Sequence, residues 1–239
     1  MPKPIGNCDH LNSLQQKLTK IKMTNKQKII IAIDGPAASG KGSLAKKLAA
    51  HFDYDFLDTG ALYRRVALKC LENDIKPNEI DKIITISADL SKNLHEKYDD
   101  NALRNDKVGD FASKVAQIPD VRANLDDFQR NFAKNAEKGA VLDGRDIGTV
   151  ICPDADVKLF ITASTEKRAE RRTLELQSRG ISVTNAQVLA EMQERDLRDK
   201  PRLDEHLIPD HDNHVIDTSD MTPNTVMDEA LAVIMPLLK

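Results

Sequence analysis

The sequence predicts an α/β protein in which a parallel sheet of five strands is covered by helices on both faces. Short apolar segments alternate along the chain with longer amphipathic segments, which is typical of a parallel sheet buried between two layers of helices. Four of the apolar segments end in a polar cluster that begins with an aspartate, at Asp34, Asp58, Asp143 and Asp217. Because the carboxyl ends of parallel strands meet at one edge of the sheet, we expect these clusters to converge there.

The segment from Lys28 to Arg64 carries the most informative pattern. An apolar run over 29–33 ends at Asp34-Gly35, small residues follow, and an amphipathic helix is expected from Lys41 to Phe52. Strand, glycine-rich turn and helix in this order are the context of a phosphate-binding loop, so the expected fold is the three-layer P-loop NTPase fold. The residues expected to hold the phosphates of ATP are Gly35, Pro36, Ala37, Ala38, Ser39, Gly40, Lys41, Gly42 and Ser43.

The loop departs from the common pattern after its lysine. The usual motif has Ser or Thr directly after the lysine, whereas Gly42 intervenes here and Ser43 follows. We expect the Ser43 hydroxyl to reach Mg²⁺ bound with ATP. A flexible turn rich in small residues is the alternative interpretation, and the strand, the helix and the lysine together disfavour it.

Composition limits the classes of function. The 239 residues include 40% hydrophobic and 31% charged residues, with a formal net charge of −3. This balance gives no general attraction to nucleic acid or to anionic membranes, and no apolar stretch is long enough for a membrane span. The three cysteines are far apart, which fits a reducing cytoplasm and neither a disulfide framework nor a zinc site. We expect a cytoplasmic monomer whose partners are small molecules.

The other elements are expected in the following order. Residues 1–27 are expected to form a disordered extension, and 28–239 a single domain. Further strands are expected at 53–57, 140–142, 157–161 and 215–217. Helices are expected at 61–73, 80–94, 108–117, 119–138, 165–177, 185–200 and 226–238, with Gly139 at a helix C-terminus and with caps at Ser164 or Thr165 and at Thr184 or Asn185.

Arginines are concentrated in one part of the chain: seven of the 13 lie between residues 168 and 202. Arg195, Arg198 and Arg202 share one helical face if the helix persists past Pro201. Their forked side chains suit phosphate oxygens. Interleaved acidic residues leave open a solvated helix with ion pairs, above all for Arg168 and Arg179. A phosphate loop with an arginine-rich flap favours phosphoryl transfer, which needs aligned phosphates, neutralised charge and excluded water.

Several separated motifs, in the right order, resemble those of bacterial cytidylate kinases. They are the loop 34–43, Asp58-Thr-Gly-Ala-Leu-Tyr-Arg64, Asp143-Gly-Arg-Asp-Ile-Gly-Thr149, 168–172, 194–199 and 216–219. The resemblance runs from about Ile29 to the C-terminus. It implies a nucleoside monophosphate kinase of pyrimidine metabolism that transfers the ATP γ-phosphate to CMP or dCMP with Mg²⁺. It also implies an acceptor-binding region at about 60–125 and a lid at about 165–202.

The resemblance implies roles for individual residues. Those expected at the acceptor's sugar and phosphate are Thr59, Tyr63, Arg64, Asp199 and Arg202, and Arg198 is expected to bind the substrate. Those expected at the cytosine are Ser113, Arg122 and Asp146, which fits a base with one amine donor and several acceptors. Lys41, Arg145 and Arg195 are expected on the transferring phosphates, and Arg171 and Arg172 on the ATP side of the lid.

The sequence departs from the family's pattern at two further places, and it allows three alternative interpretations. The connector 96–106 is short and polar, so the small β-sheet inserted in larger relatives looks truncated, and Lys200-Pro201 replaces a more usual hydroxyl-containing pair. A kinase for UMP, AMP or shikimate and a regulator that binds ATP without turnover stay open. A metal site in an exposed, irregular loop is disfavoured because its ligand spacing is loose; its residues would be His206, Asp210, His211, Asp212 and His214.

Overall fold

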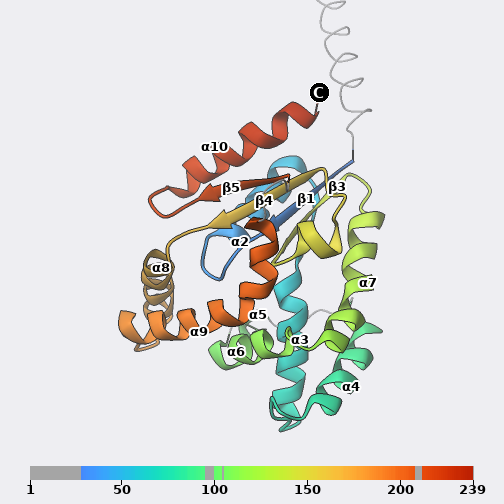
Figure 1. Cartoon of the computed structure of the whole chain (residues 1–239), viewed down its shortest axis with the longest axis vertical. Helices are drawn as coiled ribbons and strands as arrows, with labels where there is room; N and C mark the ends of the chain where they lie inside the picture. The colour runs from blue at the N-terminus through green and yellow to red at the C-terminus, as the bar shows by residue number, and fades with distance from the viewer. Residues whose placement is uncertain (1–27, 95–99, 104, 208–211, 239) are drawn as a thin grey trace, which may run out of the picture.

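A computed structural model describes residues 28–94, 100–103, 105–207 and 212–238 (Figure 1). The extension 1–27, part of the 96–106 connector, Asp210 and His211 lie outside the described residues. The described strands form one parallel sheet in the order β2-β3-β1-β4-β5, which confirms the predicted sheet. They are β1 (Ile29–Asp34), β2 (Asp55–Asp58), β3 (Gly139–Gly144), β4 (Val157–Thr162) and β5 (Asn213–Asp217).

The alternating side chains of the central strand β1 serve both faces of the sheet. Ile29, Ile31 and Ile33 pack with α2 (Lys41–Phe52) and α10 (Pro223–Ile234) on one face. Ile30 and Ala32 pack on the other face with α7 (Pro119–Asn135) and a short π-helical segment, η1 (Ile147–Ile151). Both faces are therefore covered, as in the three-layer fold that was predicted (Figure 1).

A second core lies among helices away from the sheet. It joins α3 (Thr59–Glu72), α4 (Ile80–Ser91), α6 (Asp106–Val115) and the first half of α7. The short helix α5 (Asp100–Leu103) is the described part of the connector, and this part contains no strand. Figure 1 places this helical body below the sheet, and it occupies the range expected to bind the acceptor.

Helices α8 (Thr165–Ser178) and α9 (Asn185–Leu203) form a separate pair with a small apolar core of their own. Ser164 caps α8, and Thr184 forms a capping box with Gln187 at the start of α9, as the sequence indicated. Helix α9 continues through Pro201 to Leu203, so the condition for a single arginine face is met.

Some local predictions were wrong. Helix α7 ends at Asn135, and Gly139 begins β3 against the ring of Tyr54 instead of ending a helix. The last α-helix begins at Pro223 and ends at Ile234, where a 3-10 turn, η3 (Met235–Leu238), takes over. The segments η1 and η2 (Asp204–Leu207) were not predicted. In the part of the chain that the structure describes, none of the helices has the length and apolar character needed to cross a bilayer.

Candidate active site

The loop between β1 and α2 turns sharply at the carboxyl edge of the sheet. Gly35 has a φ of +145°, and a Cβ on it would lie 2.0 Å from the backbone oxygen of Ile161, so the loop passes β4 too closely for any other residue. Ala38 and Gly40 also adopt positive φ, at 57° and 92°. The loop therefore curls over the N-terminus of α2, where the helix dipole favours an anion.

Two buried side chains hold this loop from behind. Arg168 is only 3% exposed, donates to the Ala37 carbonyl at 3.3 Å and pairs with Asp196 at 2.6 Å. The alternative of a solvated Arg168 is thus wrong. The Thr218 hydroxyl donates to the Ser39 carbonyl at 2.9 Å. These bonds tie the phosphate loop to the start of α8, to α9 and to the end of β5.

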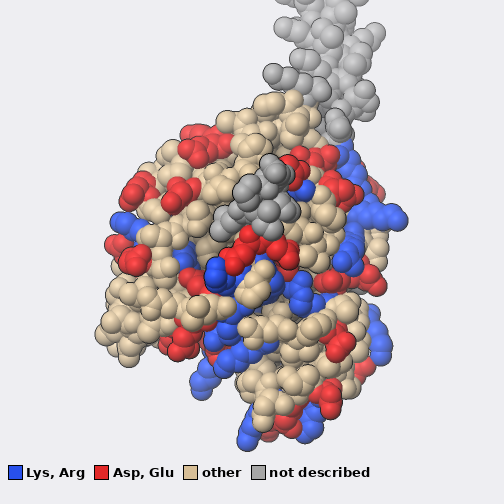
Figure 2. Space-filling view, in the orientation of Figure 1, with Lys and Arg blue, Asp and Glu red and all other residues tan. Residues whose placement is uncertain are grey.

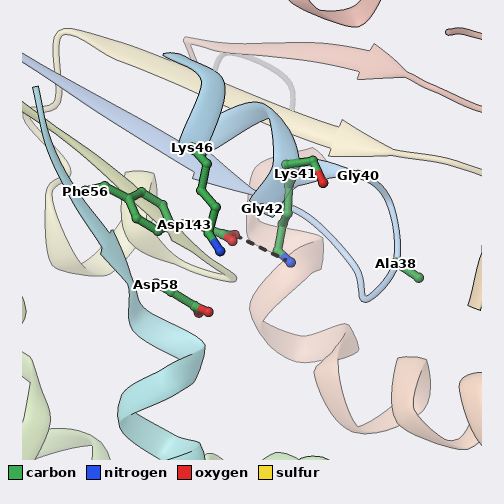
Figure 3. Close-up of a pocket in the computed structure, with 9 residues that line it drawn as sticks. Ala38, Gly40, Lys41, Gly42, Lys46, Phe56, Asp58 and Asp143 are labelled. Atoms are coloured by element: carbon green, nitrogen blue, oxygen red, sulfur yellow. Dashed lines mark ion pairs between the residues drawn. The ribbon is translucent and has the colours of Figure 1, made fainter. Parts of the chain in front are cut away.

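Lys41 begins α2 and points toward Asp143 at the end of β3, with 3.5 Å between its Nζ and a carboxylate oxygen (Figure 3). A Cβ on Gly42 would lie 2.9 Å from the other oxygen of Asp143. The glycine that interrupts the usual motif thus leaves room for this carboxylate. Burial and the nearby Arg145 lower the pKa of Lys41 to about 8, although Asp143 opposes the change.

The cavity beside the phosphate loop combines cationic and acidic groups. Lys41, Lys46, Asp58 and Asp143 line it together with the ring of Phe56, as Figure 3 shows. Ser43 lines it too. The buried Oδ1 of Asp143 lies 3.5 Å from the Lys41 ammonium and has no shorter hydrogen bond, and hydroxyl and carboxylate oxygens are ligands that Mg²⁺ takes. The donor set of Ser43, Asp58 and Asp143 therefore fits the metal that accompanies ATP.

A second cavity adjoins the first and shares Lys41, Asp58 and Asp143 with it. It lies between the strand ends, the helical body of α3 and α6, and helix α9. Figure 2 shows Lys and Arg side chains gathered across the middle of the molecule on the face drawn. Eleven of the predicted site residues line this cavity: Lys41, Gly42, Thr59, Tyr63, Arg64, Ser113, Arg145, Asp146, Arg195, Asp199 and Arg202.

Three arginines of the cavity surround one buried carboxylate. Asp199 is 2% exposed and lies 2.9 Å from Nε of Arg145, 2.5 Å from Nη2 of Arg202 and 3.9 Å from Nε of Arg195. Burial works against its charge, but Arg145, Arg202 and Arg195 outweigh burial and lower the pKa of Asp199. Burial and the neighbouring Arg145 lower the pKa of Arg195 to about 10, despite Asp199. The cations are crowded beyond what this carboxylate balances, as expected where anionic groups bind.

The residues expected to read the base lie in two pairs. Arg122 pairs with Asp146 at 2.6 Å between Nη2 and Oδ2. The Ser113 hydroxyl accepts a hydrogen bond from Nε of Arg198 at 3.1 Å, and Arg198 also pairs with Asp110 at 2.8 Å. Ser113 and Asp146 line the cavity, and Arg122 and Arg198 contact them from outside it.

The two arginines predicted on the ATP side of the lid, Arg171 and Arg172, also lie outside both cavities. Arg171 donates to the hydroxyl of Thr218 at 3.0 Å, which places it behind the phosphate loop. Arg172 pairs with Asp106 and, at 2.7 Å, with Glu175, so it links α8 to the start of α6. Their predicted contacts with ATP stay predictions.

Sequence reasoning missed several residues of the site. Asp58 and Asp143 line both cavities; the position of each at the end of an apolar strand is the signal that could have assigned them. Lys46 and Phe56 gave no such signal. His206, expected in an exposed loop, is 3% exposed, so that expectation was wrong. Among the described residues no group of three or more His, Cys, Asp or Glu side chains could hold a metal ion.

Comparisons with known proteins agree with this geometry. The family model described as cytidylate kinase matches residues 31–235. A cytidylate kinase of Paramagnetospirillum magneticum is 51% identical over 207 residues, which cover 86% of this chain and 97% of the relative. One of Methylocella silvestris is 50% identical over 208 residues, which cover 86% and 94%. A crystal structure of an uncharacterized protein from Eubacterium ventriosum has the same fold, with a TM-score of 0.52, 17% identity and coverage of 87% and 99%.

Proposed function

The chain belongs to the cytidylate kinase family and is a phosphotransferase that acts on CMP, and from that premise we propose its full reaction. It transfers the γ-phosphate of ATP to CMP or dCMP, with Mg²⁺, and gives ADP and CDP or dCDP. The observation that carries the proposal is the shared cavity in which Lys41 and Arg195 both have lowered pKa values because they are buried beside other cations. Phosphate groups brought there would lie among these cations, which can donate to their oxygens.

Residues of the two cavities have different roles in the proposed reaction. The loop Gly35–Ser43 holds the phosphates of ATP, and Ser43 with Asp58 and Asp143 would hold Mg²⁺, which neutralises phosphate charge when bound. Lys41 lies where the two cavities meet, so its ammonium can follow the phosphoryl group from donor to acceptor. On the acceptor side the guanidinium groups of Arg64, Arg145, Arg195 and Arg202 receive the phosphate of CMP.

The remaining cavity residues select and position the nucleoside. The Thr59 hydroxyl is oriented by the Asp143 carbonyl, to which it donates at 2.8 Å, and it lines the cavity where we place the sugar with Asp199. Ser113, Arg122 and Asp146 lie where we place the cytosine. Because Arg122 already orients the Asp146 carboxylate, that group is ready to accept from the exocyclic amine of the base.

An ADP-release assay across acceptors tests the proposal. CMP and dCMP are expected to give faster turnover than UMP, AMP or shikimate at equal concentration, because uracil lacks the amine that Asp146 accepts and adenine is larger. Equal rates for all acceptors would contradict the assignment of the base site. Absence of ADP with every acceptor would favour the regulator that binds ATP without turnover.

Substitution of Asp146 by asparagine tests how the site distinguishes cytosine from uracil. Asp146→Asn is expected to narrow the preference for CMP over UMP by about tenfold in kcat/KM, because an amide can also donate to the carbonyl oxygen of uracil. The measurement compares both acceptors at saturating ATP. Asp120→Asn, at an exposed position in the first turn of α7, is the matched control. An unchanged ratio would remove Asp146 from base selection.

The charge of Lys41 gives a pH dependence. Because its pKa is lowered to about 8, the free enzyme loses this positive charge as the pH rises through that value, and phosphate binding weakens. We expect kcat/KM for ATP to fall above about pH 8, whereas kcat holds to higher pH since bound phosphates raise the pKa of the lysine again. A kcat/KM for ATP that stays flat well above this pH would contradict the proposed contact.

We place the protein in the cytoplasm as a monomer. The placement in the cytoplasm rests on its nucleotide substrates and on the described cysteines, since Cys70 and Cys152 are buried free thiols. Sedimentation of the purified protein tests the monomer, and a dimer at micromolar concentration would contradict it.

A further inference from the structure

Asp34 and His206 form a buried pair behind the cavity. Their side chains are 2% and 1% exposed, and 3.4 Å separates Oδ2 of Asp34 from Nε2 of His206. Neither residue lines the cavities described above, and neither has a role in the proposed function. Such a pair is costly to bury unless its hydrogen bonds are satisfied, so its partners indicate what it does.

Asp34, the last residue of β1, holds the start of η1. Its two carboxylate oxygens accept from the backbone N–H groups of Ile147 and Gly148, at 2.9 and 2.8 Å. These two residues directly follow Arg145 and Asp146, whose side chains line the acceptor cavity. The Asp34 carboxylate therefore fixes the main chain directly after Arg145 and Asp146, the two residues whose side chains line the acceptor cavity.

His206 holds the same segment one residue earlier. Its Nε2 lies 3.0 Å from the carbonyl oxygen of Arg145, and because a carbonyl only accepts, this nitrogen carries the proton. The ring stacks on Phe160 of β4, with centroids 5.2 Å apart and planes at 28°. Asn213 at the start of β5 donates to the His206 carbonyl at 3.3 Å. The imidazole is thus held in one orientation.

The position of His206 in the chain connects this contact to α9, the helix that carries Arg195, Arg198 and Arg202. It lies in η2, which follows directly on α9. The end of α9 reaches Arg145 at two points: Asp199 accepts from its guanidinium Nε at 2.9 Å, and His206 contacts its carbonyl. Arg145, in the connection between β3 and η1, is therefore contacted at its side chain by the end of α9 and at its backbone by η2, which directly follows α9.

We propose that His206, acting with Asp34, is a positioning residue for phosphoryl transfer: it fixes the main chain at Arg145 and Asp146 and sets where the end of α9 docks on it. This inference rests on the proposed function, because the groups that it positions are the ones placed at the phosphates and the cytosine. A shift of the segment by about 1 Å would misplace a phosphate ligand and a base ligand together, and misplacements of this size can cost large factors in rate.

The unsatisfied nitrogen of the ring argues against simple space-filling. Nδ1 of His206 is buried with no hydrogen-bond partner. An apolar ring would fill the same space against Phe160 without the cost of burying that atom. The contact that only a nitrogen can make, from Nε2 to the Arg145 carbonyl, is what the histidine adds.

Two substitutions separate the N–H group from the shape. His206→Phe keeps an aromatic ring against Phe160 and removes the donor, and His206→Gln keeps an N–H near the position of Nε2. We expect His206→Phe to lower kcat and to raise KM for CMP, each by about tenfold, with KM for ATP unchanged because the hydrogen bond that is lost goes to Arg145, on the acceptor side. In His206→Gln, kcat and KM for CMP should both lie close to the values of the protein without substitutions. His214→Phe, at an exposed position on β5, is the matched control.

Amide hydrogen exchange supplies a readout that does not depend on activity. The peptide that contains Ile147 and Gly148 is expected to exchange faster in His206→Phe than in the unchanged protein or in His206→Gln. If His206→Phe does not fold, His206→Met, which is also apolar and lacks an N–H, takes its place. Unchanged kinetic constants and unchanged exchange in the apolar variant would overturn the inference, as would equal losses in the Phe and Gln variants.

The kinetic and exchange results also distinguish this inference from the proposed function. If the protein without any substitution fails to phosphorylate CMP, the proposed function is refuted. The exchange comparison would still test whether His206 fixes the main chain near Arg145. A merely structural role would lower the unfolding temperature of His206→Phe but leave KM for CMP and the turnover of each folded molecule unchanged. That outcome would also overturn the inference.

Discussion

Lys41→Ala is expected to fold and to lose roughly 10²–10³-fold in kcat, because it removes the only full charge that faces both cavities from the phosphate loop. Alanine is a good helix former, so the first turn of α2 should be retained. Burial already disfavours the charged form of this lysine, and its loss should therefore cost little stability. Steady-state rates with saturating ATP and CMP, together with a thermal unfolding curve, check both parts of this prediction.

Lys47→Ala is the matched control, since Lys47 is an exposed residue of the same helix. Its rate should equal that of the unchanged protein. If Lys41→Ala kept its turnover, the phosphate loop would have no part in the chemistry. If it failed to fold, the lysine would be a structural residue paired with Asp143.

Arg145→Ala is expected to lower kcat by a similar factor, roughly 10²–10³-fold. Burial works against the charge of this guanidinium, but Asp199 and Asp143 outweigh burial and raise its pKa, so Arg145 stays charged in the cavity. Its removal takes away one cation at the phosphates and leaves Asp199 without its 2.9 Å partner. Arg145→Lys should recover only part of the loss, because an ammonium cannot replace a planar fork.

Single-turnover rates for the two variants check this expectation. Arg130→Ala, on the exposed side of α7, is the control because its ion pairs with Asp126 and Asp127 lie outside both cavities. A loss in Arg145→Lys as severe as in Arg145→Ala would indicate that the shape of the guanidinium matters more than its charge. Normal rates in both variants would exclude Arg145 from the transfer step.

The sheet and most helices could be predicted because their signals are local. The five apolar segments are bounded by turn residues, and the capping residues Ser164 and Thr184 lie three positions before the backbone N–H groups that they bind. The gathering of functional groups at one edge followed from the geometry of parallel strands. Eleven predicted residues line one cavity, and those at the strand ends lie there for this reason.

The parts that could not be predicted depend on contacts between residues far apart in the chain. The pairing of Arg168 with Ala37 and the room that Gly42 leaves for Asp143 are of this kind. In the sequence, Asp34 looked like the other polar residues at strand ends. Its carboxylate instead accepts hydrogen bonds from the backbone N–H groups at the start of η1. Gly139 misled for a local reason, because a glycine after a helical pattern resembles a helix C-terminus until the strand that it begins is seen.

Transfer of the phosphoryl group from ATP to CMP can be followed directly. ATP labelled in its γ-phosphate is incubated with the protein, Mg²⁺ and CMP, and the products are separated. We expect the label to appear in CDP, with one ADP formed for each CDP and little label released as inorganic phosphate. Label that remains in ATP, or that is released to water and not to CMP, would contradict phosphoryl transfer to CMP.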